Sequence, residues 1–135
     1  MPLPIPASHL DLLTRPLHGV LTTLMPDGQP QSSLVWCDYD GECACVNTSC
    51  ERQKGRNMQA DPRVTLLVVD PQDTSRYLEI RGEVELLTDG ALEHLDAITR
   101  AYTRAPAYYG YVFPEAKRVI ARIKARKITL DAIHK

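Results

Sequence analysis

The sequence predicts a mainly β protein, in which six antiparallel strands form a closed or nearly closed barrel with a few short helices. Hairpin turn signals separate the first three predicted strands, which favours antiparallel neighbours over a βαβ arrangement. The later strand segments alternate apolar and polar residues or are almost wholly apolar. In a chain of 135 residues, closure into a barrel removes the exposed edges that a flat sheet would leave.

The first half of the chain contains a short predicted helix and three predicted strands. Ser8 can cap a helix that runs to Leu13. Pro26-Asp27-Gly28 and Asp40-Gly41 are turn signals between segments rich in Val, Leu and Thr. The three predicted strands are residues 19–24, 30–39 and 42–48.

The second half adds two predicted helices and three predicted strands. A basic helix begins near Arg52 and stops at Asp61-Pro62, and a second helix, which Asp89 can cap, runs to about Arg104. A bulge or bend fits the interruption near Gly82. The predicted strands are residues 64–69, 76–87 and 119–129. Successive residues of the final strand are predicted to point alternately inward and outward. The inward residues are Val119, Ala121, Ile123 and Ala125. The outward or rim residues are Arg118, Arg122, Lys124 and Arg126. The apolar side of the second helix is formed by Leu92, Leu95, Ile98 and Tyr102.

Composition predicts one globular domain over residues 1–135 and restricts its partners. The formal net charge is −1, so we expect neither a nucleic-acid nor a membrane-binding surface, and any anion site must be local. No uninterrupted apolar stretch is long enough to span a bilayer, and the first residues lack the pattern of a secretion signal. We therefore expect a cytoplasmic protein.

The four cysteines predict neither a metal site nor a redox pair. None of their spacings forms a CxxC pair, and no histidine lies near them at ligand spacing. We expect free thiols packed as small hydrophobic groups, with a disulfide between strands left open as the alternative. The cysteines are Cys37, Cys43, Cys45 and Cys50.

A run of cations at the start of the basic helix predicts an anion site. Arg52, Lys54 and Arg56 fall within five residues of one another, where backbone N–H groups carry partial positive charge. A phosphorylated ligand is the natural occupant of such a site. The alternative interpretation is a solvated basic helix face.

Polar and aromatic residues of the second and third predicted strands lie beside these cations. The hairpin keeps the two strands adjacent, so they can present a flat platform and edge hydrogen bonds to a heteroaromatic ring whose phosphate meets the cations. Taken singly, Trp36 would be a core aromatic and the hydroxyl residues ordinary strand residues. The residues of this surface are Ser32, Ser33, Leu34, Val35, Trp36, Asn47, Thr48 and Ser49.

These residues resemble a known family. The segments 19–24, 27–30, 33–36, 52–58 and 61–64 resemble, in order and in register, the FMN-binding split barrels of the pyridoxamine 5′-phosphate oxidase-like superfamily. The resemblance extends over residues 12–87. Within it, the R-x-K-x-R-N run and the Val35-Trp36 pair are most similar to the small oxidoreductases that use the deazaflavin coenzyme F420.

The resemblance implies a six-stranded antiparallel split β-barrel that forms a homodimer with cofactor sites at its interface. It implies F420, or alternatively FMN, as the cofactor. By position, Ser33 to Trp36 would follow the ring, Asn47 and Thr48 would bond its edge or the ribityl chain, and Arg52 and Lys54 would hold the phosphate. The remaining implied contacts are Arg56 and Asn57, on the phosphate or a longer anionic tail, and Tyr77, on the cofactor of the other subunit.

The sequence also departs from the vitamin B6 oxidases of that superfamily. Those enzymes have adjacent Arg-Lys on this helix and an arginine-rich C-terminal segment, whereas here Gln53 separates Arg52 from Lys54 and the chain stops at residues 133–135. We therefore do not expect oxidation of pyridoxamine phosphate. The departures leave the choice between F420 and FMN open.

The expected function is an F420-dependent oxidoreductase that transfers a hydride between the deazaflavin and a small conjugated organic substrate. Since the cofactor supplies the hydride, no catalytic triad or metal-ligand set is required. The alternatives are an FMN-binding oxidoreductase, a non-catalytic flavin- or deazaflavin-binding protein, and a β-barrel interaction module. His94 is expected at the rim. Tyr108, Tyr109 and Tyr111 are candidates for a substrate pocket or, alternatively, for packing of a loop.

Overall fold

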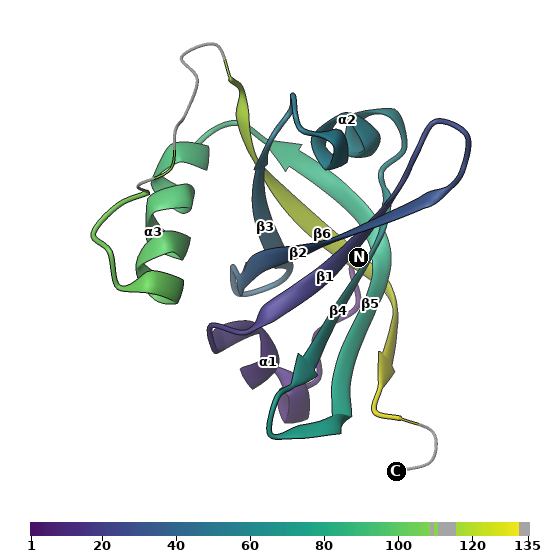
Figure 1. Cartoon of the computed structure of the whole chain (residues 1–135). Coiled ribbons are helices and arrows are strands. Elements are labelled where there is room, and N and C mark those ends of the chain that lie inside the picture. Colours follow the sequence, from purple (N-terminus) through teal and green to yellow (C-terminus); the bar gives the residue numbers. More distant parts are fainter. Residues whose placement is uncertain (109, 111–115, 133–135) are drawn as a thin grey trace.

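A computed structural model describes residues 1–108, 110 and 116–132 of the chain. In these residues six antiparallel strands close into a barrel in the order β1-β2-β3-β6-β5-β4 (Figure 1), which confirms the predicted fold class. Each strand lies within a few residues of its predicted position. The strands are β1 (His18–Leu24), β2 (Pro30–Tyr39), β3 (Ala44–Ser49), β4 (Arg63–Asp70), β5 (Asp73–Leu87) and β6 (Arg118–Leu130).

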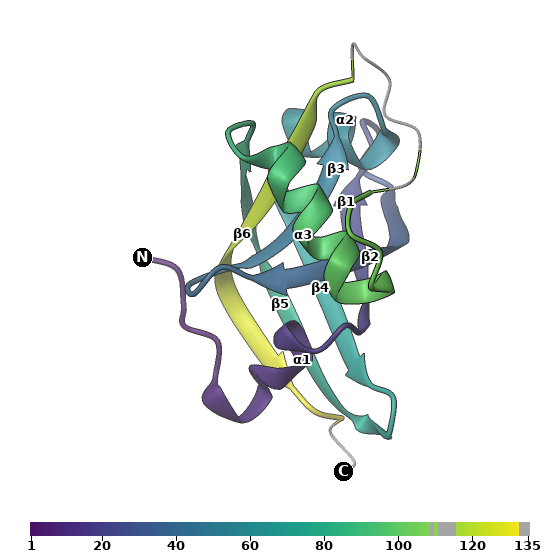
Figure 2. The ribbon, with the colours of Figure 1, turned by 90° about the vertical axis from the view of Figure 1, so that its left-hand side faces the viewer.

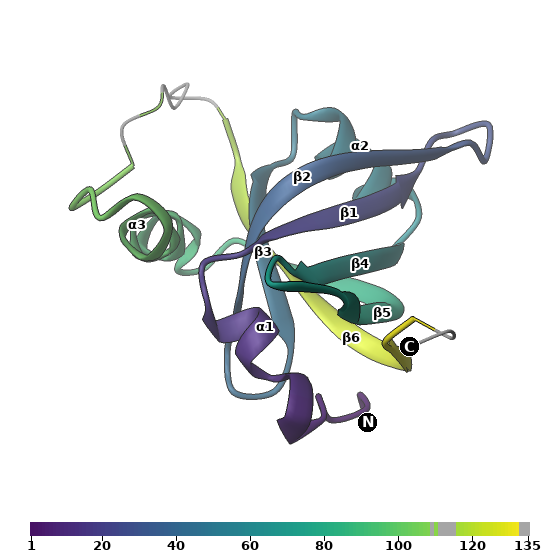
Figure 3. The same ribbon diagram turned by 60° about the horizontal axis from the view of Figure 1, so that its bottom comes forward.

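The helices cover the two ends and one side of the barrel. A 3₁₀ turn, η1 (Ala7–His9), and α1 (Asp11–Thr14) lie at one end, and α2 (Gln53–Ala60) lies at the other. Helix α3 (Ala91–Thr103) packs along the outside against β2, β3 and β6, as Figure 2 shows. Figure 3 shows α1 beneath the barrel and α3 beside it.

Two predicted helix caps are wrong. The Ser8 hydroxyl contacts Nδ1 of its neighbour His9 at 2.8 Å and caps no helix. The N-cap of α3 is Gly90, not Asp89, and Gly90 has the left-handed φ of 76° that glycine adopts without steric cost. The predicted extents of the helices are otherwise close to the observed ones.

The core fills the barrel interior with the inward side chains of every strand. Leu66, Leu78 and Ile80 are each 0% exposed, and the four predicted inward residues of β6 are all buried, which confirms that alternation. The prediction for Leu92 is wrong, since it is 56% exposed. Ala91, Leu95 and Ile98 form the buried stripe of α3 at i, i+4 and i+7, and Leu92 lies one position off that stripe.

Local backbone chemistry explains the strand boundaries. The Asp40 carboxylate accepts hydrogen bonds from the backbone N–H groups of Glu42 and Cys43 at 2.9 and 2.8 Å, so these residues belong to the turn and β3 begins later than predicted. The pairing of β5 with β6 shifts register between Arg81 and Gly82, which confirms the predicted bulge.

The four cysteines are free thiols, as predicted. Burial raises the pKa of the Cys37 thiol to about 11 and also raises that of Cys43, which makes both poor nucleophiles near neutral pH. No group of metal-ligating side chains occurs among the residues described above. None of the helices in that part of the chain is long and apolar enough to cross a membrane.

Candidate functional site

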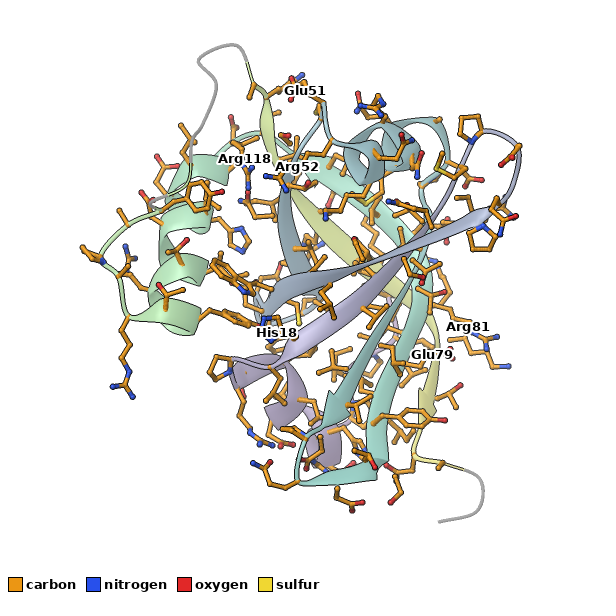
Figure 4. The ribbon with its side chains drawn as sticks, viewed as in Figure 1. His18, Glu51, Arg52, Glu79, Arg81 and Arg118 are labelled. Carbon is orange, nitrogen blue, oxygen red and sulfur yellow. The ribbon has the colours of Figure 1, made fainter. Side chains whose placement is uncertain are left out.

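A cavity of about 340 Å³ opens where the first turn of α2, β2, β3, β6 and α3 meet. Figure 4 shows Arg52 and Arg118 near one another at the α2 end of the barrel, with His18 farther along β1. The cavity combines cations, one aromatic wall and an apolar side. Its lining residues are His18, Leu34, Val35, Trp36, Asn47, Thr48, Arg52, Lys54, Leu95, Ile98, Tyr108 and Arg118.

Gly55 allows α2 to approach the end of β3 closely enough to present its first turn to the cavity. A Cβ atom at this position would lie 2.0 Å from the Ser49 carbonyl oxygen, an overlap that no side chain tolerates. Arg52 is the N-cap residue of α2 and makes no side-chain cap. Its own backbone N–H donates to the Ser49 carbonyl at 3.2 Å. A backbone contact therefore holds Arg52 at the end of β3, and its side chain is left to line the cavity.

Three cations converge on the cavity, and none has a carboxylate partner among the described residues. Burial, together with Arg52 and Arg118, lowers the pKa of Lys54, and burial together with Arg52 lowers the pKa of Arg118. Lys54 Nζ donates to Ser33 Oγ at 3.2 Å. Within residues 1–108, 110 and 116–132, none of the three forms a salt bridge. Their mutual repulsion would be relieved by a bound anion.

The Thr48 hydroxyl, at the same cavity, lacks a hydrogen-bond partner within the described residues. Thr48 is 1% exposed, and its Oγ1 is the sole buried side-chain polar atom in the described residues that has no hydrogen-bond partner. A buried hydroxyl without a partner costs about 1–3 kcal/mol. A polar ligand atom in the cavity is a natural partner for it.

The aromatic wall of the cavity is held rigidly from behind. The ring of Trp36 stacks on Tyr102 with centroids 5.2 Å apart and an interplanar angle of 17°. The Tyr102 hydroxyl donates to the Leu17 carbonyl at 2.6 Å and accepts from the Cys37 backbone N–H at 2.9 Å. Burial raises the pKa of that hydroxyl, so it stays protonated. This arrangement gives a planar ligand a fixed surface beside the cations.

The structure brings together part of the predicted site. The predicted residues that line the cavity are Leu34, Val35, Trp36, Asn47, Thr48, Arg52 and Lys54. Ser33 borders it through its contact with Lys54. Ser32 instead exchanges a hydrogen bond of 2.8 Å with Thr22 on the barrel surface. Ser49 contributes its backbone carbonyl to the start of α2.

Three other predicted residues lie outside the cavity of this chain. Arg56 is exposed and donates to the side chain of Gln53 at 2.6 Å. Asn57 is buried, and its amide donates to Thr23 Oγ1 at 3.0 Å, which ties α2 to β1. Tyr77 lies on β5, where it pairs with Val69, and the side chain of its neighbour Arg76 contacts Asp11 of α1. The contact expected of Tyr77 with the cofactor of another subunit stays a prediction.

Several lining residues were not predicted as ligand contacts. Arg118 was placed at the outward or rim side of its strand, whereas its guanidinium lies at the cavity and sits 5.8 Å from the centroid of the Tyr108 ring. His18, Leu95 and Ile98 were missed as well. Tyr108, a predicted candidate for a pocket, lines the cavity. Tyr109 and Tyr111 lie outside the described residues.

Comparisons with known proteins identify the family of the chain and solved structures with a similar fold. A family profile described as pyridoxamine 5′-phosphate oxidase matches residues 5–134. The structure is similar to that of an F420 reductase, with 34% identity, a TM-score of 0.79, and coverage of 93% of this chain and 98% of that one. A conserved hypothetical protein of Mycobacterium tuberculosis has 26% identity, a TM-score of 0.72, and coverage of 96% and 86%. A heme-binding protein of Mycobacterium smegmatis shares the fold, with 20% identity, a TM-score of 0.69, and coverage of 95% and 55%.

Proposed function

Because the chain belongs to the pyridoxamine 5′-phosphate oxidase family, we propose that this cavity binds a phosphorylated flavin-type cofactor and that the protein is an oxidoreductase. F420 is the proposed cofactor and FMN the alternative. The observation that carries the proposal is a set of three cations around one cavity, Arg52, Lys54 and Arg118, none of which forms a salt bridge within the described residues. The similarity to an F420 reductase at 34% identity supports the choice of F420.

The residues present fit such a cofactor. Arg52 and Lys54, with the free N–H groups at the start of α2, suit a phosphate. Trp36 and the backbone of Leu34 and Val35 offer a flat surface for the ring system, and the unpartnered Thr48 hydroxyl offers a hydrogen bond to a polar edge. Within the described residues, Arg52 and Lys54 form no salt bridge and the Thr48 hydroxyl has no hydrogen-bond partner, and Lys54 has further N–H donors beside the one it gives to Ser33.

When bound, the reduced cofactor would supply a hydride for the reduction of a conjugated organic substrate, and the reduced product would then take up one proton from bulk solvent. The chain itself binds and orients. Leu95 and Ile98 form the apolar side of the cavity and exclude water from it. Trp36, held by Tyr102, fixes the plane against which the ring lies. This division of labour is typical of enzymes whose chemistry is carried by a cofactor.

We further propose a homodimer with the cofactor at the subunit interface. At about 340 Å³ the cavity of one chain lies near the lower limit for small-molecule sites. Leu34 lines it and is 69% exposed, so an apolar surface continues outward from the cavity. A second copy would cover Leu34 and enlarge the site. Sedimentation of the purified chain with and without cofactor tests the dimer. We also propose that the protein is cytoplasmic.

The test of the proposed function is a titration of the purified protein with F420 and with FMN, followed through the fluorescence of Trp36, the single tryptophan of the chain. We expect saturable quenching in the micromolar range or tighter, with F420 the stronger ligand. Absence of binding to both would overturn the proposal.

A second measurement separates catalysis from binding. Reduced F420 is mixed with the protein and a panel of enones, quinones and tetrapyrroles, and its oxidation is followed by absorbance. The proposal predicts oxidation that depends on protein and on substrate. Tight binding with no oxidation across the panel would instead support a non-catalytic cofactor-binding protein.

A further inference from the structure

A continuous chain of hydrogen bonds runs from Asp38 to the cavity through three other side chains. His94 Nε2 lies 3.0 Å from both carboxylate oxygens of Asp38. His94 Nδ1 lies 3.0 Å from Asn47 Nδ2. Asn47 Oδ1 accepts from Arg118 Nε at 3.0 Å and from Arg118 Nη2 at 2.7 Å. The chain crosses β2, α3, β3 and β6 and ends at a guanidinium that lines the cavity.

The partners of Asn47 fix the direction of every bond in this chain. Its amide nitrogen donates to the Ala91 carbonyl at 2.8 Å, while its amide oxygen accepts from Arg118, so both neighbours demand the same amide orientation. The second amide hydrogen then faces His94 Nδ1, which acts as an acceptor. His94 consequently carries its proton on Nε2 and donates it to Asp38. All groups are satisfied in this single arrangement.

Asn47 has no capacity left for a ligand. Arg118 occupies its oxygen with two hydrogen bonds, and Ala91 and His94 occupy its two amide hydrogens. A direct contact of the Asn47 side chain with the ring or ribityl chain, which the resemblance implies, would require Asn47 to give up one of these bonds, and it stays a prediction. The position of Asn47 at the cavity serves to hold the guanidinium.

The arrangement orients Arg118 without neutralising it. A carboxylate in direct contact with Arg118 would cancel the charge that attracts an anion, whereas the neutral amide of Asn47 does not. The negative charge of Asp38 is separated from Arg118 by a histidine and an amide. Burial and the charge of Arg52 lower the pKa of Arg118, although the charge of Glu51 acts in the opposite direction. Among the described residues, Arg118 forms no salt bridge.

We propose that Asp38, His94 and Asn47 form a relay that positions Arg118 as a third binding group for the anionic part of the cofactor, beside Arg52 and Lys54. This inference rests on the proposed function and extends it, because it assigns a binding role to Arg118 and a positioning role to three residues on other elements. The recognised group is a phosphate or a carboxylate attached to the ring compound.

The test compares ligands with and without the anionic part. FMN and riboflavin differ only in the phosphate, whereas F420 and its ring compound differ in the phosphate and the anionic tail together. Each pair is titrated against each variant, and the ratio of the two dissociation constants isolates the contribution of the anionic part. Arg118→Ala is expected to weaken FMN or F420 about tenfold or more and to leave the uncharged ligands unchanged. Arg126→Gln is the matched control, because Arg126 lies on the same strand but pairs with Glu83 at 2.9 Å.

A double-mutant cycle tests the relay itself. His94→Leu removes both hydrogen bonds at similar volume and is expected to weaken the phosphorylated ligand about threefold to tenfold. His94→Gln, whose amide can donate to Asp38 and accept from Asn47, should recover most of that loss. In the Arg118→Ala background, His94→Leu should cause no further loss. If His94→Leu does not fold, as judged by thermal unfolding, Asn47→Ala is used in the same cycle with the same expectation.

The outcomes distinguish the inference from the proposed function. Equal loss from the His94 or Asn47 variant with and without Arg118 would overturn the relay. An Arg118→Ala variant that binds FMN and F420 like the wild type would also overturn it. In both cases strong loss on substitution of Arg52 and Lys54 would leave the proposed function standing. If the wild type itself binds riboflavin as tightly as FMN, and F420 no better than its ring compound, both proposals fail.

Discussion

Two clusters of cationic side chains lie at opposite ends of the same barrel and have opposite environments. At the α1 end, Arg76 donates to Asp70 at 2.9 Å and also pairs with Asp11, and Arg15 pairs with Asp11 at 3.1 Å. At the α2 end, Arg52, Lys54 and Arg118 share a cavity and have no carboxylate partner in the described part of the chain. The residue types are similar, but the two clusters differ in their carboxylate partners and in their burial.

The pKa shifts of the two clusters run in opposite directions. Hydrogen bonds with Asp11 and Asp70 raise the pKa of Arg76, and the hydrogen bond from Arg76 lowers the pKa of Asp11. At the other end, burial and neighbouring cations lower the pKa values of Lys54 and Arg118. Charge that is already compensated ties α1 to the barrel, whereas uncompensated charge is available to a ligand.

The largest effect should come from removing the uncompensated charge. Replacing both Arg52 and Lys54 with Ala should weaken FMN and F420 binding about a hundredfold to ten-thousandfold, since each charge-assisted contact contributes about 1.5–3 kcal/mol. Riboflavin binding should change little. Fluorescence titration measures both. Unchanged affinity for the phosphorylated ligands would contradict the claim that the cations at the α2 end bind a ligand while those at the α1 end do not.

Gly55→Ala should damage the α2 end through the backbone. The new Cβ would meet the Ser49 carbonyl at 2.0 Å, so α2 must shift away from β3. We expect a net loss of about 2 kcal/mol in the free energy of unfolding, even though alanine favours helices by about 1 kcal/mol. Chemical denaturation measures the loss. Wild-type stability with wild-type cofactor affinity would show that the close approach is not needed.

Thr48→Val should change stability and affinity in opposite directions. Removing a buried hydroxyl that has no partner should raise the free energy of unfolding of the ligand-free protein by about 1 kcal/mol. The same change should weaken cofactor binding, because the hydroxyl is proposed to contact the ligand.

Thr23→Val is the control for Thr48→Val. Thr23 is equally buried at 1% exposed, but its hydroxyl accepts from Asn57 at 3.0 Å. The substitution leaves the Asn57 amide nitrogen only the weakly accepting Met25 sulfur at 3.4 Å and should destabilise the protein. If Thr48→Val destabilises as much as Thr23→Val, the Thr48 hydroxyl has a partner within the folded chain.

Arg76→Gln should have the smallest effect of these variants. It should lower the stability of the protein slightly and leave cofactor affinity unchanged. The substitution removes two ion pairs at the α1 end, and partly exposed pairs of this kind contribute little. We expect a fall in Tm of a few degrees at most and no change in affinity for FMN or F420. Weakened cofactor binding in this variant would mean that the two ends of the barrel are coupled.

Local signals in the sequence predicted the fold and half of the site. Asp40-Gly41 predicted a hairpin because the turn chemistry is contained within a few residues. Arg52 and Lys54 were found because a helix start and its cations are adjacent in sequence. Asn57 shows the limit of this reasoning, because it belongs to the same run yet turns inward to Thr23.

The rest of the site depends on contacts between distant segments. Arg118 reaches the cavity because β6 pairs with β3 and places it opposite Ser49, a pairing that no local pattern indicates. His94 was expected to be a rim residue, and its side chain is instead 14% exposed and bonded to Asp38 and Asn47. That role requires the docking of α3 against the barrel, which the periodicity of one helix cannot specify.

A crystal structure of the protein with F420, and in parallel with FMN, tests the central claim most directly. We predict a phosphate within hydrogen-bond distance of Arg52 and Lys54 at the start of α2, with the ring system against Trp36. The account is contradicted if the phosphate lies elsewhere, for example in the groove bordered by Arg63, Arg81 and Arg126, while the side chains of Arg52 and Lys54 point into solvent.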